Sequence, residues 1–312
     1  MIKGGLDKKL GGLIVLKQMS VIAILVGIGI WLQKRDVLND KSTPFLSRIV
    51  VDICNPALIV SSIVSGNISV THEDFLNGVG ISAAVYFLFI VLGYIVPHII
   101  RVPKDERKFY TMMCIFGNVG FLGIPVARAI LPENCMLYVI ICNVFYNLIF
   151  YTHGIVTLSS GKEKMNLKKL FSPGVLMSVF ALVIFWFDLE LPDMIENTIQ
   201  YLGNPTVFLS MILLGAAVGR SRFFEEVSDL KLWMFILIRL VAVPVAVVIL
   251  LGLLNVQEEM IRTFCLMCAV PVGNLPMIQA EKTGERTDVL SKGIIVTTVF
   301  SFFSITILMS FL

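Results

Sequence analysis

The stretch FGNVGFLGIP, residues 116–125, decides how this chain can fold, because it places helix breakers inside an apolar segment. It holds three glycines, an asparagine and a proline within a run, 109–131, that is long enough to span a membrane. Glycine weakens a helix, and proline removes a backbone donor. Unpaired backbone groups are costly in hydrocarbon, so the stretch predicts a break that lies inside the protein or lines a wet cavity.

A second stretch of the same kind, VPVGNLP at residues 270–276, lies in another apolar run. A half-helix that starts at a break offers free N–H groups and the positive end of its dipole. Two such ends facing one point would hold an anion, and the amides of Asn118 and Asn274 can donate to a carboxylate. Pro125 and Pro276 suit the first turns of the outgoing half-helices. For either break alone, an ordinary packing notch or kink remains an alternative.

The composition is that of an integral membrane protein. Of the 312 residues, 57% are hydrophobic and 15% charged, and the mean hydropathy is +0.88, whereas soluble proteins carry about 25% charged residues. The net charge of +3 gives no support for nucleic-acid binding. We therefore expect an all-α membrane protein of ten spans, of which the sixth looks short. The spans are residues 11–32, 44–65, 78–100, 109–131, 136–158, 173–187, 194–218, 232–254, 261–280 and 289–312.

Positive charge alternates from loop to loop. Lysine and arginine concentrate in the loops after the odd-numbered spans, and the other loops carry almost none. The positive-inside rule places the odd-numbered loops in the cytoplasm, and therefore both termini outside the cytoplasmic membrane. Lys3, Lys8 and Lys9 argue against this placement of the first span. The charges that support it are Lys34, Arg35, Lys41, Arg101, Lys104, Arg107, Lys108, Lys162, Lys164, Lys168, Lys169, Arg220, Arg222, Lys231, Lys282, Arg286 and Lys292.

Dipeptides recur at matching positions in the two halves. Asn-Pro occurs at 55–56 in the second span and at 204–205 in the seventh, and Gly-Asn occurs at 117–118 in the fourth span and at 273–274 in the ninth. With five spans in each half, the second half must enter the membrane in the opposite sense, which predicts an inverted repeat. The predicted units are a first five-helix repeat at 1–158, a short cytoplasmic linker at 159–172 and a second repeat at 173–312.

Charged residues inside the spans are candidates for function, because charge is costly in the membrane. Asp52 lies three residues before Asn55, so a regular helix would place both on one face. Asp52 is either a proton carrier, with a pKa raised by burial, or a partner of Arg48. Arg128 lies near the outer end of the fourth span, whereas Arg239 lies deeper and is a candidate to neutralise Asp52 or attract an anion.

The predicted substrate-binding residues come from both breaks and the second span, and Asp52 is the candidate for ion coupling. No nucleophile–base pair is evident, so we expect no enzyme. The three histidines show no metal spacing, and Cys265 and Cys268 read as small buried hydrophobes, so neither a metal nor a cofactor is expected. The substrate-binding set is Asn118, Asn274, Gly117, Gly120, Gly123, Pro125, Pro271, Gly273, Pro276 and Asn55.

Several stretches resemble the auxin efflux carrier family, in its bacterial branch related to plant PIN carriers. They are FGNVGFLGIPVARAILP (116–132), LSRIVVDICNPALIVSSIV (46–64), VFLSMILLGAAVGR (207–220) and AVPVGNLPMIQAEKTG (269–284). The resemblance implies ten spans in an inverted repeat, with broken spans four and nine crossing between a scaffold domain (spans 1, 2, 6 and 7) and a transport domain (spans 3–5 and 8–10). It implies an elevator-type carrier of organic acids, of the kind labelled malate or malonate permease. Carboxylate binding by the crossover asparagines would fall on Asn118 and Asn274.

The sequence therefore predicts a secondary carrier for a small organic anion, auxin-like or dicarboxylate, in the lipid bilayer and as a homodimer. Whether H⁺ or Na⁺ travels with it stays open. One alternative is a sodium-coupled symporter similar to the bile-acid carriers, with carbonyls freed at the crossover holding the ion. Another is a membrane sensor that binds a ligand without moving it.

Overall fold

The computed structural model describes residues 2–66, 68–161, 171–220 and 230–312, with side chains from residue 12 onward. Most of the expected linker at 159–172 therefore lies outside the described residues, as do the positive charges of Lys162, Lys164, Lys168, Lys169 and Arg222, and the side chains of Lys3, Lys8 and Lys9.

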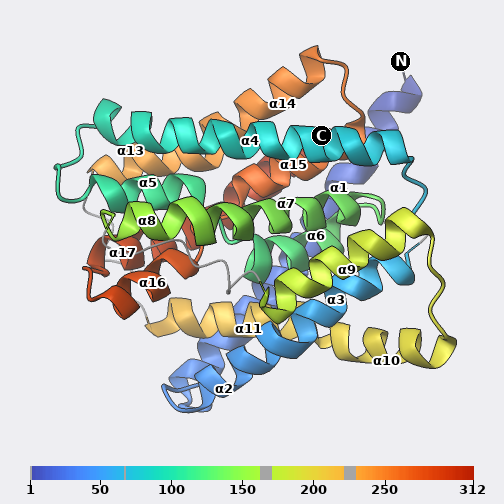
Figure 1. Ribbon diagram of the computed structural model, residues 1–312, viewed down its shortest axis with the longest axis horizontal. Coiled ribbons are helices and arrows are strands. Elements are labelled where there is room, and N and C mark those ends of the chain that lie inside the picture. Colours follow the sequence, from blue (N-terminus) through green and yellow to red (C-terminus); the bar gives the residue numbers. More distant parts are fainter. Residues whose placement is uncertain (1, 67, 162–170, 221–229) are drawn as a thin grey trace.

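All regular structure in these described ranges is helical, and they hold no strand beyond one isolated bridge between Gly117 and Val272. Figure 1 labels the α-helices, and the π-helical turns between them are named η in the text. The first half forms α1 (Ile2–Lys34), α2 (Ser42–Ile49), η1 (Val50–Cys54), α3 (Asn55–Val64), α4 (His72–Ile99), α5 (Arg107–Ile115), η2 (Val119–Gly123), α6 (Ile124–Ile130), α7 (Cys135–Ile149), η3 (Phe150–Gly154) and α8 (Ile155–Leu158). The second half forms α9 (Pro173–Phe187), α10 (Asp193–Gly203), α11 (Pro205–Arg220), α13 (Leu230–Leu237), η5 (Ile238–Ala242), α14 (Val243–Leu253), α15 (Glu258–Ala269), α16 (Leu275–Thr283) and α17 (Asp288–Phe311).

Seven helical stretches of the described chain are long and apolar enough to cross a membrane, which confirms an all-α membrane protein. They coincide with predicted spans one, two, three, five, seven, eight and ten. The sixth predicted span is α9, whose 15 residues reach only about 22 Å. The fourth and ninth are interrupted at the two quoted breaks. The count of ten therefore remains a prediction. The seven stretches are Gly12–Lys34, Ser42–Val64, His72–Ile99, Cys135–Leu158, Asp193–Arg220, Leu230–Leu253 and Asp288–Phe311.

Three of the described π turns lie directly ahead of a proline. η1, η2 and η5 end two residues before Pro56, Pro125 and Pro244, respectively. A proline donates no hydrogen bond and its ring clashes with the preceding turn of an α-helix. The extra residue of a π turn relieves this conflict, because it shifts the hydrogen-bonding register just ahead of the proline. These spans therefore continue through their prolines.

The helices form two groups on opposite sides of the molecule (Figure 1). α2, α3, α10 and α11 lie along one side, α4, α13 and α14 lie along the other, and α6, α7 and α15 lie between them. α1 crosses α11 with almost no space between the backbones: a Cβ atom added at Gly215 would lie 2.1 Å from the carbonyl oxygen of Val26. Small residues permit such approaches in membranes.

The two Asn-Pro dipeptides mark irregular helices that pack against each other. Asn55 and Pro56 begin α3 directly after η1, and the helix changes at Asn204, between α10 and α11. Gly203 packs on α3 so closely that an added Cβ atom would lie 2.9 Å from the Cα atom of Leu58. The matched positions of the two halves are thus in contact.

Candidate functional site

The two breaks meet backbone to backbone. α5 ends at Ile115 and α15 ends at Ala269, and the extended segments that follow lie antiparallel. The Asn118 N–H donates to the Pro271 carbonyl at 2.7 Å, and the Gly273 N–H donates to the Phe116 carbonyl at 2.9 Å. Backbone groups that would be costly to leave unpaired in the membrane therefore satisfy each other.

The close approach of the two segments depends on glycine. A Cβ atom added at Gly273 would lie 2.8 Å from the carbonyl oxygen of Gly117 and 3.1 Å from the hydroxyl of Tyr146. Real Cβ atoms essentially never come that near to backbone. Any side chain at this position must therefore separate the segments or displace Tyr146.

The outgoing half-helices start differently. Asn118 caps η2, because its side-chain oxygen accepts from the Phe121 N–H at 3.2 Å, and its side chain is only 5% exposed. Asn274 precedes α16, makes no cap hydrogen bond and is exposed. Pro276 lies in the first turn of α16, as the sequence predicts, whereas Pro125 lies at the start of α6, one π turn after the first outgoing half-helix begins at Val119. The NH₂ group of Asn118 and the first-turn N–H groups of α16 are the donors able to take an anion here.

A polar cluster surrounds Gly120, at the start of η2. The Asn55 side chain on α3 donates to the Gly120 carbonyl at 3.1 Å, and its own oxygen is buried with no partner in the described structure. Asn143 on α7 is 4% exposed and donates to the Ser178 hydroxyl on α9 at 3.0 Å. Its side-chain oxygen accepts from Asn147 at 3.3 Å. An added Cβ atom at Gly120 would lie 3.8 Å from the side chains of both Asn55 and Asn143. We call Asn55, Gly120, Asn143 and Ser178 the amide cluster.

Sequence reasoning missed Asn143 and Ser178 of this cluster. Asn143 carried a usable signal, since it is an amide in the middle of the apolar segment 136–158. Sequence reasoning also missed Thr297 on α17, whose hydroxyl accepts from the Val272 N–H at 3.0 Å and so satisfies one more group of the second break. A threonine in an apolar helix gives no comparable signal.

Asp52 faces away from this cluster. Its carboxylate pairs with Arg48 at 3.3 Å, and its side chain is 43% exposed. The expected shared face of Asp52 and Asn55 is wrong, because Asp52 lies within the wider π turn η1 and Asn55 directly follows it. In a π turn a spacing of three residues no longer returns to the same side of the helix. The structure thus shows the partnership with Arg48, one of the two readings of Asp52.

Arg239, on η5, lies at the first break. Its side chain is 1% exposed, it donates to the carbonyl of Cys268, and its guanidinium carbon lies 4.8 Å from the centre of the Phe89 ring. An added Cβ atom at Gly117 would lie 2.8 Å from Nη2 of Arg239. Arg239 therefore contacts the crossing of the two segments, while Asp52 has Arg48 for its partner. Arg128 pairs with Glu133 at 3.9 Å.

Ion pairs join the far ends of the two broken spans. Lys108 at the start of α5 meets Glu285, just after α16, at 2.6 Å. Arg286 meets Asp105 at 3.3 Å and Asp288 at 2.8 Å, and the hydrogen bond to Asp288 raises the pKa of the Arg286 guanidinium. These contacts and the backbone bridge hold the two broken spans together at both ends of α5 and α16.

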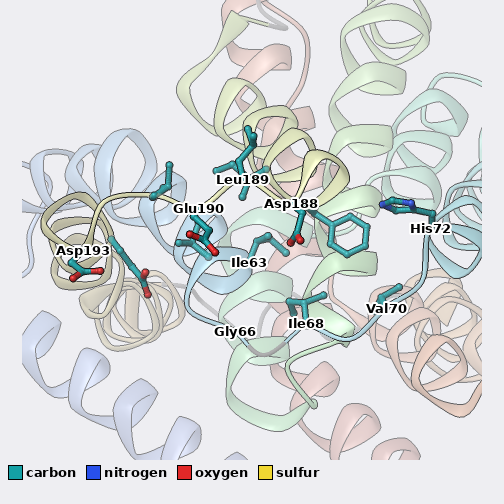
Figure 2. Close-up of a pocket in the computed structure, with 14 residues that line it drawn as sticks. Ile63, Gly66, Ile68, Val70, His72, Asp188, Leu189, Glu190 and Asp193 are labelled. Carbon is teal, nitrogen blue, oxygen red and sulfur yellow. The ribbon is translucent and has the colours of Figure 1, made fainter.

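A cavity of about 550 Å³ lies away from the breaks, where α3 and α9 end (Figure 2). Four carboxylates line it, together with His72, which stacks on Trp186 at 4.5 Å. No residue of either break is among its lining. Acidic walls repel an anion, so this cavity does not suit the predicted substrate. The carboxylates are those of Asp188, Glu190, Asp193 and Glu196.

In the part of the chain that the structure describes, no group of three or more histidine, cysteine or acidic side chains is arranged so that it could hold a metal ion. The six cysteines are free and buried. Cys265 and Cys268 are fully buried in α15, as expected of small apolar residues.

Comparison with known proteins identifies the family of this chain. A family model described as membrane transport protein matches residues 14–309. An uncharacterized transporter of Methanocaldococcus jannaschii is 23% identical over 294 residues, covering 90% of this chain and 93% of that protein. An uncharacterized transporter of Methanothermobacter thermautotrophicus is 24% identical over 291 residues, with 91% and 94% covered. Protein PIN-LIKES 1 of Arabidopsis thaliana is 27% identical over 121 residues, which cover 37% of this chain and 25% of that protein.

The match extends across both breaks and nearly the whole chain, and the relatives carry transporter names. The resemblance to auxin efflux carriers is thereby confirmed, and the chain is a transporter rather than an enzyme. The chain belongs to the membrane transport protein family, as a multi-pass membrane protein of the auxin efflux carrier type.

Proposed function

We propose that this transporter is a secondary carrier of a small organic anion, a mono- or dicarboxylate of auxin-like or malate-like kind. The substrate would bind at the crossing of the two broken spans. One observation carries the proposal: the breaks are hydrogen-bonded to each other, with half-helix N-termini and buried amides gathered around them. Broken helices near the midplane are where secondary transporters bind substrates.

The chemistry of the amide cluster and the breaks suits a carboxylate. The Asn118 amide, the first-turn N–H groups of α16 and the positive helix ends all favour negative charge. Only neutral groups would touch the substrate. A bound carboxylate would then exchange hydrogen bonds with water for hydrogen bonds with amides, without forming a buried ion pair that is slow to separate.

Ten spans in an inverted five-plus-five repeat are part of the proposal, with units at 1–158 and 173–312. Contacts between matched positions support it: the two Asn-Pro regions touch through Gly203 and Leu58, and the two Gly-Asn breaks share backbone hydrogen bonds. The packing of α1 on α11, and of α3 on α9 and α10, fits a scaffold of spans one, two, six and seven. The remaining spans would form the transport domain of an elevator. The cytoplasmic membrane, external termini and a homodimer stay predictions.

The test begins with a substrate. A thermal-shift screen of the purified protein against a panel of carboxylates identifies a ligand, whose uptake is then measured in proteoliposomes. We expect Asn118→Ala, Asn274→Ala and Asn143→Ala each to lower uptake at least tenfold. Asn197→Ala, at an exposed asparagine of α10, is the matched control and should transport normally.

Unchanged uptake in both Asn118→Ala and Asn274→Ala would show that the crossing is not the substrate site. A protein that binds the acid but shows no counterflow would act as a sensor. Its membership of a transporter family argues against that outcome.

A further inference from the structure

Arg239 is a buried charge that would not touch the proposed substrate. Its side chain is 1% exposed, and its described contacts are the Cys268 carbonyl and the face of the Phe89 ring. Nε and Nη2 are buried without a hydrogen-bond partner in the described residues. No salt bridge to Arg239 is found there either. A lone guanidinium in a membrane core is costly, so its retention calls for a physical reason.

The surroundings of the guanidinium supply negative potential of another kind. Cys268 lies in the last turn of α15, and Gly117, where an added Cβ atom would lie 2.8 Å from Nη2 of Arg239, follows the last residue of α5 by two positions. The last carbonyls of a helix have no partner within it and carry the negative end of its dipole. Both half-helices end at the crossing, so their negative ends converge where Arg239 lies.

Carbonyl oxygens at unwound helix ends are the groups with which transporters hold a coupling cation. Here a guanidinium from the chain itself takes that position. It donates to a last-turn carbonyl of α15, and Nη2 lies 2.8 Å from where a Cβ atom at Gly117 would be. The amide cluster lies at Gly120, three residues after Gly117. The two side chains that an added Cβ atom would meet there, Asn55 and Asn143, are both uncharged.

We propose that Arg239 is a resident cation, which neutralises the negative ends of α5 and α15 and occupies the place that a coupling Na⁺ would take. The folded carrier then needs no sodium ion at the crossing. The inference rests on the proposed function only in treating the crossing as the substrate site.

The test requires no substrate, so its failure is distinguishable from failure of the carboxylate proposal. Thermal unfolding of the full-length protein in detergent is followed in NaCl and in choline chloride of equal ionic strength. We expect the same melting temperature for the wild type in both salts. In choline chloride, Arg239→Ala should have a melting temperature several degrees below that of the wild type. Millimolar Na⁺ or guanidinium should restore part of this difference in a saturable way. Arg239→Lys, which keeps the charge, should stay near the wild type.

Arg128→Ala is the matched control, since it removes an arginine of a broken span that has an acidic partner. It should gain no response to Na⁺ or guanidinium, which also controls for denaturation by guanidinium. A saturable stabilisation of the wild type by Na⁺ would overturn the proposal, as would an Arg239→Ala protein that is stable and indifferent to cations. If Arg239→Ala does not fold, the wild-type sodium titration and the stability of Arg239→Lys decide the question.

Discussion

Replacement of Gly273 by alanine tests whether the two breaks form one unit. The added methyl group would lie 2.8 Å from the Gly117 oxygen and 3.1 Å from its carbonyl carbon. Backbone cannot rotate away as a side chain can, and this backbone is held by hydrogen bonds at 2.7 and 2.9 Å. The methyl group must therefore push the two segments apart.

The cost follows from these contacts. Overpacking costs about 1–3 kcal/mol, and the loss of two backbone hydrogen bonds adds about 0.5–1.5 kcal/mol each. Together they lower the free energy of unfolding by about 2–6 kcal/mol. In a large domain 1 kcal/mol corresponds to about 2–4 °C, so we expect the melting temperature to fall by about 5 °C or more.

A thiol-reactive dye provides the assay, because all six cysteines are free and buried and become reactive on unfolding. Gly120→Ala is the matched control. Its methyl group would lie 3.8 Å from the Asn55 and Asn143 side chains, which is ordinary contact, so its melting temperature should stay near that of the wild type. Equal melting temperatures for Gly273→Ala and the wild type would refute the close crossing of the segments.

Three further predictions concern the scaffold, the ion pairs and the topology. Gly215→Ala should lower the melting temperature by several degrees, because its methyl group would lie 2.1 Å from the Val26 oxygen; unchanged stability would mean that α1 and α11 lie farther apart. Glu285→Gln should cost about 1–2 kcal/mol by leaving the partly buried Lys108 without its ion pair, and the difference in melting temperature should shrink in high salt. Lys104→Cys, on an exposed loop, should resist a membrane-impermeant maleimide in intact cells and react in open membranes; labelling of intact cells would invert the predicted topology.

The positions of the broken spans could be predicted because hydropathy and helix breakers act locally. α5 ends at Ile115 and α15 ends at Ala269, each directly before the stretch that marks the break in the sequence. The first-turn position of Pro276 follows from the missing proline N–H, which is again a local property. No knowledge of tertiary contacts was needed for these features.

The facing of individual side chains could not be predicted, because π turns change the helical register. A regular helix places Asp52 and Asn55 on one face. In the structure, however, Asp52 is exposed and pairs with Arg48, whereas Asn55 donates a hydrogen bond to the first break. Arg239 lies within another π turn, η5. Its position in the sequence of the span therefore predicted its depth in the membrane but not which residues it contacts. A hydropathy pattern does not encode which residues form a π turn.

The partners within the amide cluster were also beyond the sequence. Asn143 meets Ser178 across 35 residues, and Asn55 meets Gly120 across 65. Such pairs are set by how α7 packs on α9 and how α3 packs on the break, and a single sequence carries no record of which helices are neighbours. The amides themselves were visible as polar residues in apolar spans.

The break has two faces of different electrostatic character. Gly117 faces the guanidinium of Arg239, whereas Gly120 faces the neutral amides of Asn55 and Asn143. Under the proposed function, a carboxylate on the amide side would be attracted by a positive charge that lies behind the backbone and never pairs with it. A direct buried ion pair would strip water from both charges and hold the substrate tightly. A carrier must also release its substrate, so separating the cation from the binding face would let the site attract an anion and still let it go.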